Sequence, residues 1–418
     1  LRHRATIGKR KGGSPVIHWL SLRNFRCWRE VERLPLKPIT ILFGTNSSGK
    51  TALLHSLLML KQTSESNDRG LSLVYSGYAD LGSFQDVIHG HDEGQTLGVG
   101  LNWELWLPGL FGGKLGDGFW DTPIDYEASW RRDGEVGLDV LAYTRHTPHV
   151  GIRMKRSADR YVTQVESAQP GHALHVTLRS PGSCYALPGD VARNWPDLDL
   201  LALNRQFELL MGRIRYLGPL RNSPRREYLW TGEAPTSLGR DGAGTVEALL
   251  ADARNGDAGA PDGLVAAASH WLNEFGLAGA LEVVPIGERG RYYEVRLVTP
   301  GGTARTLLPD VGFGVSQVLP VIVQLFFVPE GSIVLLEQPE IHLHPGAASL
   351  LGDLFLDVAE RRNLQLIIES HSEHLLARLQ RRVAEGEKAF ATPDKLALYF
   401  CELRDGAAHA RPVEVNEM

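Results

Sequence analysis

The residues of this chain best suited to chemistry form one short segment near its start. Residues Gly44–Thr51 read GTNSSGKT and fit the pattern G-x-x-x-x-G-K-[ST] with no mismatch. In such a loop, backbone N–H groups surround a phosphate, Lys50 neutralises its charge, and the Thr51 hydroxyl binds Mg²⁺. The residues expected to hold ATP here are Gly44, Asn46, Ser47, Ser48, Gly49, Lys50, Thr51 and Ala52. The segment therefore predicts a phosphate loop that binds ATP and Mg²⁺.

A phosphate loop needs a strand before it and a helix after it, and the flanking residues predict both. Ile39–Phe43 is short, β-branched and apolar, as in a buried strand, and Pro38 precedes it. Thr51–Leu60 predicts a helix with a broad apolar face. The loop amides and the helix N-terminus would then point at the β-phosphate. This context argues against a glycine-rich turn that fits the pattern by chance.

A second group of chemically suited residues lies in the last third of the chain. Ile333–Glu337 is an apolar strand that ends in a carboxylate, the usual magnesium-binding partner of a phosphate loop. The segment PEIHLHP follows, then a helix over residues 347–362 and a buried strand over 364–368 that leads into ESHSEH. Upstream, the glycine-rich turn DVGFGVSQ opens a helix over residues 316–327. These elements predict the second half of a nucleotide domain.

Composition and charge limit the class of protein. The chain has 418 residues, 43% hydrophobic and 22% charged, which is enough for one large or two medium domains. A net charge of −5 argues against a uniformly basic nucleic-acid binder, although a local basic patch fits it. We expect a cytoplasmic protein without a membrane partner, because the chain has three widely spaced cysteines, no long apolar run and no signal peptide. The first residue is Leu, so we expect the natural start to be missing.

The pattern of elements divides the chain into four parts. Residues 1–14 predict a basic flexible tail, with a nucleic-acid contact as the alternative. Residues 15–94 and 301–418 predict the two halves of an α/β nucleotide domain, with helices on both faces of a sheet. Between them, residues 95–300 predict an insertion of short strands followed by helices.

The motifs taken together resemble those of ABC-type ATPase heads. The resemblance is carried by LRNFRCW, ITILFGTNSSGKT, DLGSFQDVIHGHD, YLGPLR, EQPEIHLHP and the final SHS. It is greatest for the OLD nuclease, RecF and SMC branch, whose members are usually described as AAA family ATPases. Many members of that branch come from bacterial anti-phage or DNA-maintenance operons. The resemblance implies an α/β ABC-type ATPase head interrupted by the insertion, and it covers about half of the chain.

The resemblance also implies roles for single residues. Gly49, Lys50 and Thr51 would bind phosphate and Mg²⁺, and Glu337 would take the acidic metal-binding role. Gln85, in SFQDV, would sense the γ-phosphate and contact the metal, and His371 would be the switch histidine. The segment from Gly312 to Gln317 would be the signature segment, in which Gly312, Gly314 and Ser316 cap the γ-phosphate held by a second subunit.

One departure from this pattern concerns the catalytic base. Where the family usually has Asp-Glu, this chain has Glu337 and Gln338. A glutamine can orient a water molecule but cannot accept its proton. Either Glu340 or His371 serves instead, or hydrolysis is slow and the protein is an ATP-gated switch, or the position has been mutated. The first two interpretations are favoured because EQPE fits the subgroup.

Other clusters have simpler explanations or remain open. A zinc site at His342 and His344 is disfavoured because the family pattern accounts for them, and a Ser370–His371 nucleophile pair is disfavoured because neighbours on a strand point apart. The arginines around YLGPLR form either a solvated, salt-bridged face or a contact to nucleotide or DNA phosphates. They are Arg213, Arg215, Arg221, Arg225 and Arg226.

These inferences predict an ATPase that works as a homodimer, with ATP between two heads in head-to-tail contact. ATP-driven closure would regulate an effector nuclease or toxin on a separate chain, because the segment after Ser372 is too short for a nuclease domain. The alternative is a DNA-binding maintenance ATPase of the RecF or SMC kind. The SMC version is disfavoured because the sequence has no long heptad run. A transporter ATPase is disfavoured because of the long insertion.

Overall fold

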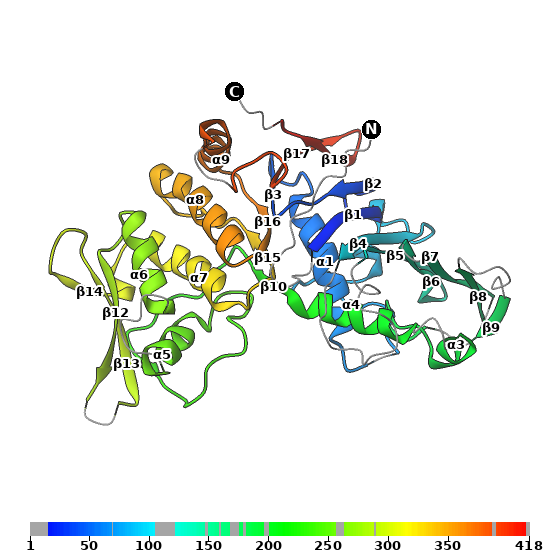
Figure 1. Cartoon of the computed structure of the whole chain (residues 1–418), viewed down its shortest axis with the longest axis horizontal. Coiled ribbons are helices and arrows are strands. Elements are labelled where there is room, and N and C mark those ends of the chain that lie inside the picture. Colours follow the sequence, from blue (N-terminus) through cyan, green and yellow to red (C-terminus); the bar gives the residue numbers. More distant parts are fainter. Residues whose placement is uncertain are drawn as a thin grey trace, which may run out of the picture.

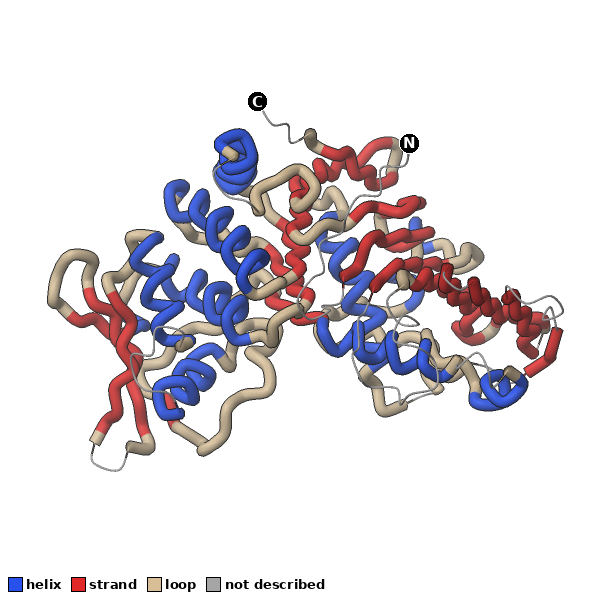
Figure 2. Tube along the Cα trace, viewed as in Figure 1, coloured by secondary structure: helices blue, strands red, loops and turns tan. Residues whose placement is uncertain are grey.

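The computed structural model describes residues 16–68, 70–104, 122–146, 149–158, 160–167, 175–178, 181–195, 200–255, 263–287, 290–386 and 390–414. A central sheet separates two lobes (Figure 1). One lobe is rich in strands, and the other is mostly helical with a small sheet at its outer side (Figure 2). None of the described helices is long and apolar enough to span a membrane.

The central sheet has six strands in the order β10-β15-β16-β3-β17-β18. Its first five strands run parallel, and β18 pairs antiparallel with β17. Continuous apolar runs such as Ile333–Glu337 suit a parallel sheet, because both faces of such a sheet are covered. The strands are β3 (Ile39–Gly44), β10 (Ile214–Leu217), β15 (Ile333–Glu337), β16 (Gln365–Glu369), β17 (Leu396–Arg404) and β18 (Ala407–Pro412).

Alternate residues of the central strands contribute to two separate cores. In β15, Ile333 and Leu335 join the core on the side of α1 and α4, whereas Val334 and Leu336 join the core of the helical lobe. This follows from the two-residue period of a strand. The helices that cover the two faces are α1 (Lys50–Ser64), α4 (Leu201–Arg213), α7 (Phe313–Phe327), α8 (Pro345–Arg361) and α9 (Glu373–Glu385).

The strand-rich lobe is one eight-stranded antiparallel sheet in the order β2-β1-β4-β5-β6-β7-β8-β9. Phe207 of α4 packs on Tyr126, Trp103 and Tyr185, which joins the sheet to the helix beneath it. The elements of this lobe are β1 (Val16–Phe25), β2 (Trp28–Pro35), α2 (Phe84–Val87), η1 (His89–His91), β4 (Leu97–Glu104), β5 (Ile124–Asp133), β6 (Glu135–His146), β7 (His149–Ser157), β8 (Arg160–Ser167), β9 (His175–Leu178) and α3 (Gly189–Asn194).

The helical lobe carries a third, four-stranded sheet in which β13 pairs with β11, β12 and β14. Trp271 and Leu272 of α6 belong to the core between this sheet and α7. The remaining elements are β11 (Tyr228–Leu229), α5 (Thr245–Asn255), α6 (Leu264–Glu274), β12 (Ala280–Ile286), β13 (Tyr292–Val298), β14 (Arg305–Leu307) and η3 (Leu308–Asp310).

The α/β class predicted from the sequence is confirmed, and two strand pairings cross the predicted domain boundaries. β1 pairs with β4, so the strands after residue 95 continue the sheet that begins at residue 16. β10 lies within the predicted insertion but pairs with β15 in the central sheet. The predicted tail over residues 1–14 lies outside the described residues. The helix predicted from residue 316 begins three residues earlier, at Phe313, because Gly312 is its N-cap.

Candidate nucleotide site

The carboxyl ends of the parallel strands bring the candidate residues to one edge of the central sheet. β3 ends at Gly44, where the phosphate loop begins, while β15 and β16 end at Glu337 and Glu369. These two glutamates are register partners, and Glu369 also pairs with Leu42 of β3. Ligands of open α/β sheets bind at this edge.

Two glycines shape the phosphate loop because neighbouring segments press against them. Gly44 has a φ of 140°, and a Cβ there would lie 2.0 Å from the Cys401 carbonyl oxygen. Gly49 has a φ of 92°, and a Cβ there would lie 2.7 Å from Cys27 Sγ. Trp28 Nε1 donates a hydrogen bond to the Gly49 carbonyl oxygen at 2.9 Å. The β1–β2 turn therefore fixes the shape of the loop.

Lys50 points into the loop that it follows. Its Nζ donates to the carbonyl oxygens of Thr45 at 2.7 Å and Gly44 at 3.1 Å, and to Ser48 Oγ at 3.3 Å. Burial lowers the pKa of Lys50, and the nearby Glu369 carboxylate opposes that shift. The ammonium group is thus directed at the place where the loop would hold phosphate.

The carboxylate that contacts Thr51 is Glu369. Thr51 Oγ1 donates to Glu369 Oε2 at 2.6 Å, and only 4% of Glu369 is exposed. Burial raises the pKa of Glu369, and the Glu337 carboxylate adds to the rise. Sequence analysis gave this residue no role. The available signal was that β16, like β15, is an apolar run ending in glutamate.

Glu337 occupies the neighbouring strand end and has different partners. Its Oε1 accepts from the Tyr216 hydroxyl at 2.8 Å and lies 3.3 Å from His55 Nε2. His55 Nδ1 in turn lies 2.9 Å from Nη1 of Arg26, in the β1–β2 turn. Burial, and then the Glu337 carboxylate, raise the pKa of Tyr216. The metal-binding role predicted for Glu337 remains a prediction.

The donor set at this edge fits Mg²⁺. Mg²⁺ prefers oxygen ligands and is usually held by one or two carboxylates together with substrate phosphates. Thr51, Glu369 and Glu337 supply one hydroxyl and two buried carboxylates within this small region. Among the described residues, no group of three or more His, Cys, Asp or Glu side chains is placed to hold a metal without phosphate.

Glu340 contacts the segment that contains His371. Glu340 Oε1 accepts from Ser370 Oγ at 2.8 Å and from the His371 backbone N–H at 2.7 Å. Its Oε2 is buried and has no hydrogen-bond partner within the described part of the chain. Burial and the Lys50 charge lower the pKa of His371, whose ring also hydrogen bonds with the Gly44 backbone. Both predicted alternatives for the base therefore lie beside the phosphate loop.

Gln338 follows Glu337 in a strained backbone conformation. Its φ is 44°, in the left-handed region that non-glycine residues seldom adopt. Its backbone N–H donates to the Glu369 carbonyl oxygen at 2.8 Å. This hydrogen bond ties the turn after β15 to the end of β16.

The other predicted site residues lie apart from these contacts. Gly312, Gly314 and Ser316 lie at the start of α7, where the Phe313 ring meets the His342 ring edge-on at 4.9 Å. Gln85 lies on α2, and its backbone carbonyl accepts from His91 Nδ1 at 2.8 Å. Within the described ranges, the side chain of Gln85 forms no hydrogen bond with the phosphate loop. The roles given to these residues remain predictions.

Two family models match parts of the chain. The description "AAA domain, putative AbiEii toxin, Type IV TA system" matches residues 205–377, and "AAA ATPase domain" matches residues 16–96. The first range contains Glu337, Glu340 and His371, and the second contains the phosphate loop. No curated protein matches the chain.

Solved structures of SMC heads align with nearly the whole chain. A head bound to the C-terminal winged-helix domain of ScpA has 12% identity and a TM-score of 0.49, covering 96% of this chain and 98% of that one. The head from Thermotoga maritima has 12% identity and a TM-score of 0.43, covering 96% and 99%. The head from Pyrococcus furiosus, bound to the C-terminal domain of ScpA, has 11% identity and a TM-score of 0.46, covering 96% of each. Together, the phosphate-loop geometry and the two family matches support a nucleotide-binding ATPase.

Proposed function

We propose that this chain is an ABC-type ATPase head that binds ATP with Mg²⁺, hydrolyses it and closes as a homodimer around it. The observation that carries the proposal is the meeting of Lys50, Thr51 and Glu369 at the carboxyl edge of the parallel strands. The chemistry that Mg²⁺ would supply there is neutralisation of phosphate charge. Thr51, Glu369 and Glu337 are the residues that would hold it.

Each residue of the site has a task that its contacts support. Lys50 would turn its ammonium group from the loop carbonyls to the β- and γ-phosphates. Glu340 is the favoured proton acceptor, because one carboxylate oxygen is fixed and the other is buried without a partner in the described residues. Gln338 would orient the attacking water, and His371 would contact the γ-phosphate.

The dimer and the effector extend the proposal beyond one chain. In the described residues, the start of α7 makes no hydrogen bond with the phosphate loop, so a second subunit would bring its signature segment to the nucleotide. The effector would be a nuclease or toxin acting in trans, in bacterial anti-phage defence. The DNA-maintenance alternative has less support, because Arg226 of the arginine cluster is paired with Asp310.

The phosphate-loop assignment is tested by Lys50→Ala. Removing the ammonium group should weaken ATP binding at least tenfold, about 1.4 kcal/mol, because a charge-assisted contact to phosphate is lost. Isothermal titration calorimetry with ATP and Mg²⁺ measures the change. Lys395→Ala is the matched control, since Lys395 packs on the Phe390 ring away from the loop. Unchanged affinity in Lys50→Ala would show that the loop does not bind the nucleotide.

A further inference from the structure

The five arginines near YLGPLR have different environments in the folded chain. Arg226 forms a bidentate ion pair with Asp310, with distances of 2.6 and 2.9 Å, at the surface. Arg213 and Arg215 donate to backbone carbonyl oxygens. Arg225 is exposed. Arg221 differs from all of these, because it is only 8% exposed.

The guanidinium group of Arg221 is buried and mostly unpartnered. Its Nη2 donates to the Glu337 carbonyl oxygen at 3.2 Å. Its Nε and Nη1 are buried and have no hydrogen-bond partner among the residues that the structure describes. Burial lowers the pKa of Arg221 only to about 10, so the group is charged at neutral pH. A buried charge with open donors is destabilising unless a ligand accepts hydrogen bonds from those donors.

Arg221 lies at the same edge of the sheet as the phosphate loop. It follows β10 by four residues, and β10 is the parallel neighbour of β15. Its bond to the Glu337 carbonyl places it where β15 ends. Neighbouring parallel strands lie about 4.8 Å apart. Because β16 lies between β15 and β3, the strand that leads into the phosphate loop, β15 and β3 are about 10 Å apart. A triphosphate chain that begins in the loop can span much of that distance.

The open donors of Arg221 match a phosphoryl group. A guanidinium fork pairs with carboxylates or with phosphates. The carboxylate candidate is Glu340, but its Oε2 is also unpartnered among the described residues, so the two groups do not satisfy each other. Both groups would be satisfied if a phosphoryl oxygen accepted from Arg221 and a water molecule donated to Glu340.

We propose that Arg221 binds the terminal phosphoryl group of the nucleoside triphosphate held by its own chain and thereby distinguishes ATP from ADP. The inference rests on the proposed function. It adds a γ-phosphate contact from the segment after β10 to the contacts proposed for Gln85 and His371. Arg221 is also hydrogen bonded to the Glu337 carbonyl oxygen at the end of β15. Loss of the γ-phosphate would therefore change the contacts of Arg221 at that strand end.

Calorimetric titrations of the full chain with ADP and with the β,γ-imido analogue of ATP, both with Mg²⁺, test this contact. The wild type should bind the analogue more tightly than ADP. Arg221→Met keeps the aliphatic stem but removes the donors, so it should bind the analogue at least tenfold more weakly and change ADP affinity less than twofold. Arg225→Met, on the same loop but exposed, should change neither affinity.

The outcomes separate this inference from the proposed function. A wild type that binds neither nucleotide refutes the proposed function and the inference with it. The inference alone is refuted if the wild type binds the analogue and ADP equally well. It is also refuted if Arg221→Met still prefers the analogue, or if it lowers the affinity for both nucleotides equally. If Arg221→Met does not fold, Arg221→Lys decides, because it retains the charge and loses the fork. Arg221→Lys should then reduce the preference for the analogue over ADP, and an unchanged preference would overturn the inference.

Discussion

At the scale of single residues, the open question is which group accepts the proton of the attacking water. The family resemblance predicts a base at the position of Gln338, but its amide cannot take a proton. Glu340 can, and its contacts with Ser370 and the His371 backbone fix it beside the loop. The geometry therefore favours Glu340 over a switch that hydrolyses slowly for want of any base.

Glu340→Gln should lower the single-turnover rate of ATP hydrolysis by about 10²–10⁴-fold, because a positioned base contributes an acceleration of that size. Gln338→Glu should leave the rate unchanged or lower it, since a third carboxylate would repel Glu337 and Glu340. Rapid-quench measurements with saturating enzyme give both rates. If Gln338→Glu accelerates hydrolysis instead, the native enzyme lacks a base and the slow-switch interpretation is right. If neither change matters but His371→Ala abolishes turnover, His371 is the base.

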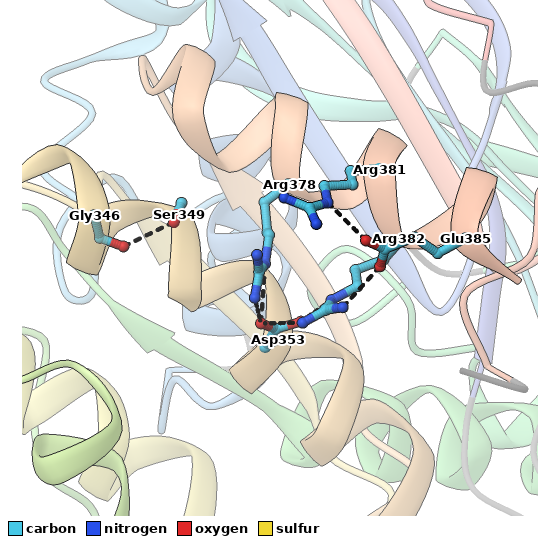
Figure 3. Close-up of polar contacts among 7 residues, drawn as sticks. All are labelled: Gly346, Ser349, Asp353, Arg378, Arg381, Arg382 and Glu385. Carbon is cyan, nitrogen blue, oxygen red and sulfur yellow. Dashed lines mark hydrogen bonds and ion pairs between the residues drawn. The ribbon is translucent and has the colours of Figure 1, made fainter. Parts of the chain in front are cut away.

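At the scale of elements, α9 is attached to α8 by a cluster of charged side chains (Figure 3). Asp353 of α8 accepts from Arg378 Nε at 3.0 Å and from Arg382 Nε at 2.7 Å. Glu385 then binds Arg381 and Arg382. The Asp353 side chain is 9% exposed, so solvent screens these contacts little. Because Ser372 is the N-cap of α9, the cluster also anchors the segment that contains His371.

Asp353→Asn should lower the free energy of unfolding by about 2 kcal/mol, because hydrogen bonds to a charged group are lost and two arginines remain partly buried. Asp357→Asn is the matched control on the same helix. Its partner Arg361 is 76% exposed, so that change should amount to about 0.5 kcal/mol or less. Urea unfolding monitored by circular dichroism measures both. Equal effects of the two substitutions would show that the cluster is no stronger than a surface ion pair.

At the scale of the whole molecule, the proposed dimer places the start of α7 against a second subunit. Ser316 is a poor position at which to test this, since it is 7% exposed and its Oγ donates to the Phe313 carbonyl oxygen. An arginine there would overpack the interior and disturb folding. Phe313 is 60% exposed and is the better probe of the same surface.

Phe313→Glu should prevent the ATP-dependent dimer, because it would bring a carboxylate to the phosphates bound by the partner subunit and remove apolar contact area. Light scattering with ATP and Mg²⁺ on the slowly hydrolysing Glu340→Gln background measures the oligomeric state. Leu403→Glu, at an exposed position on β17, is the control and should dimerise normally. A dimer that survives Phe313→Glu, or a strict monomer with ATP before any substitution, would contradict the sandwich arrangement.

Local sequence patterns were enough to predict the phosphate loop, the elements around it and the class of the fold. The strand predicted at Ile333–Glu337 has those bounds in the structure, and the helix predicted from Thr51 is α1. These features depend on apolar periodicity and on a motif of adjacent residues, which neighbouring side chains are enough to specify.

Which distant residues meet depends on the packing of the whole fold. Thr51 and Glu369 are 318 positions apart, and they touch because β16, and not β15, is the neighbour of the phosphate-loop strand. The same strand order buries Arg221 at the end of β15, where the sequence showed one arginine among five. Two strands that both read as an apolar run ending in glutamate are equivalent by local pattern. Strand order distinguishes them, and it is set by how all the layers pack together.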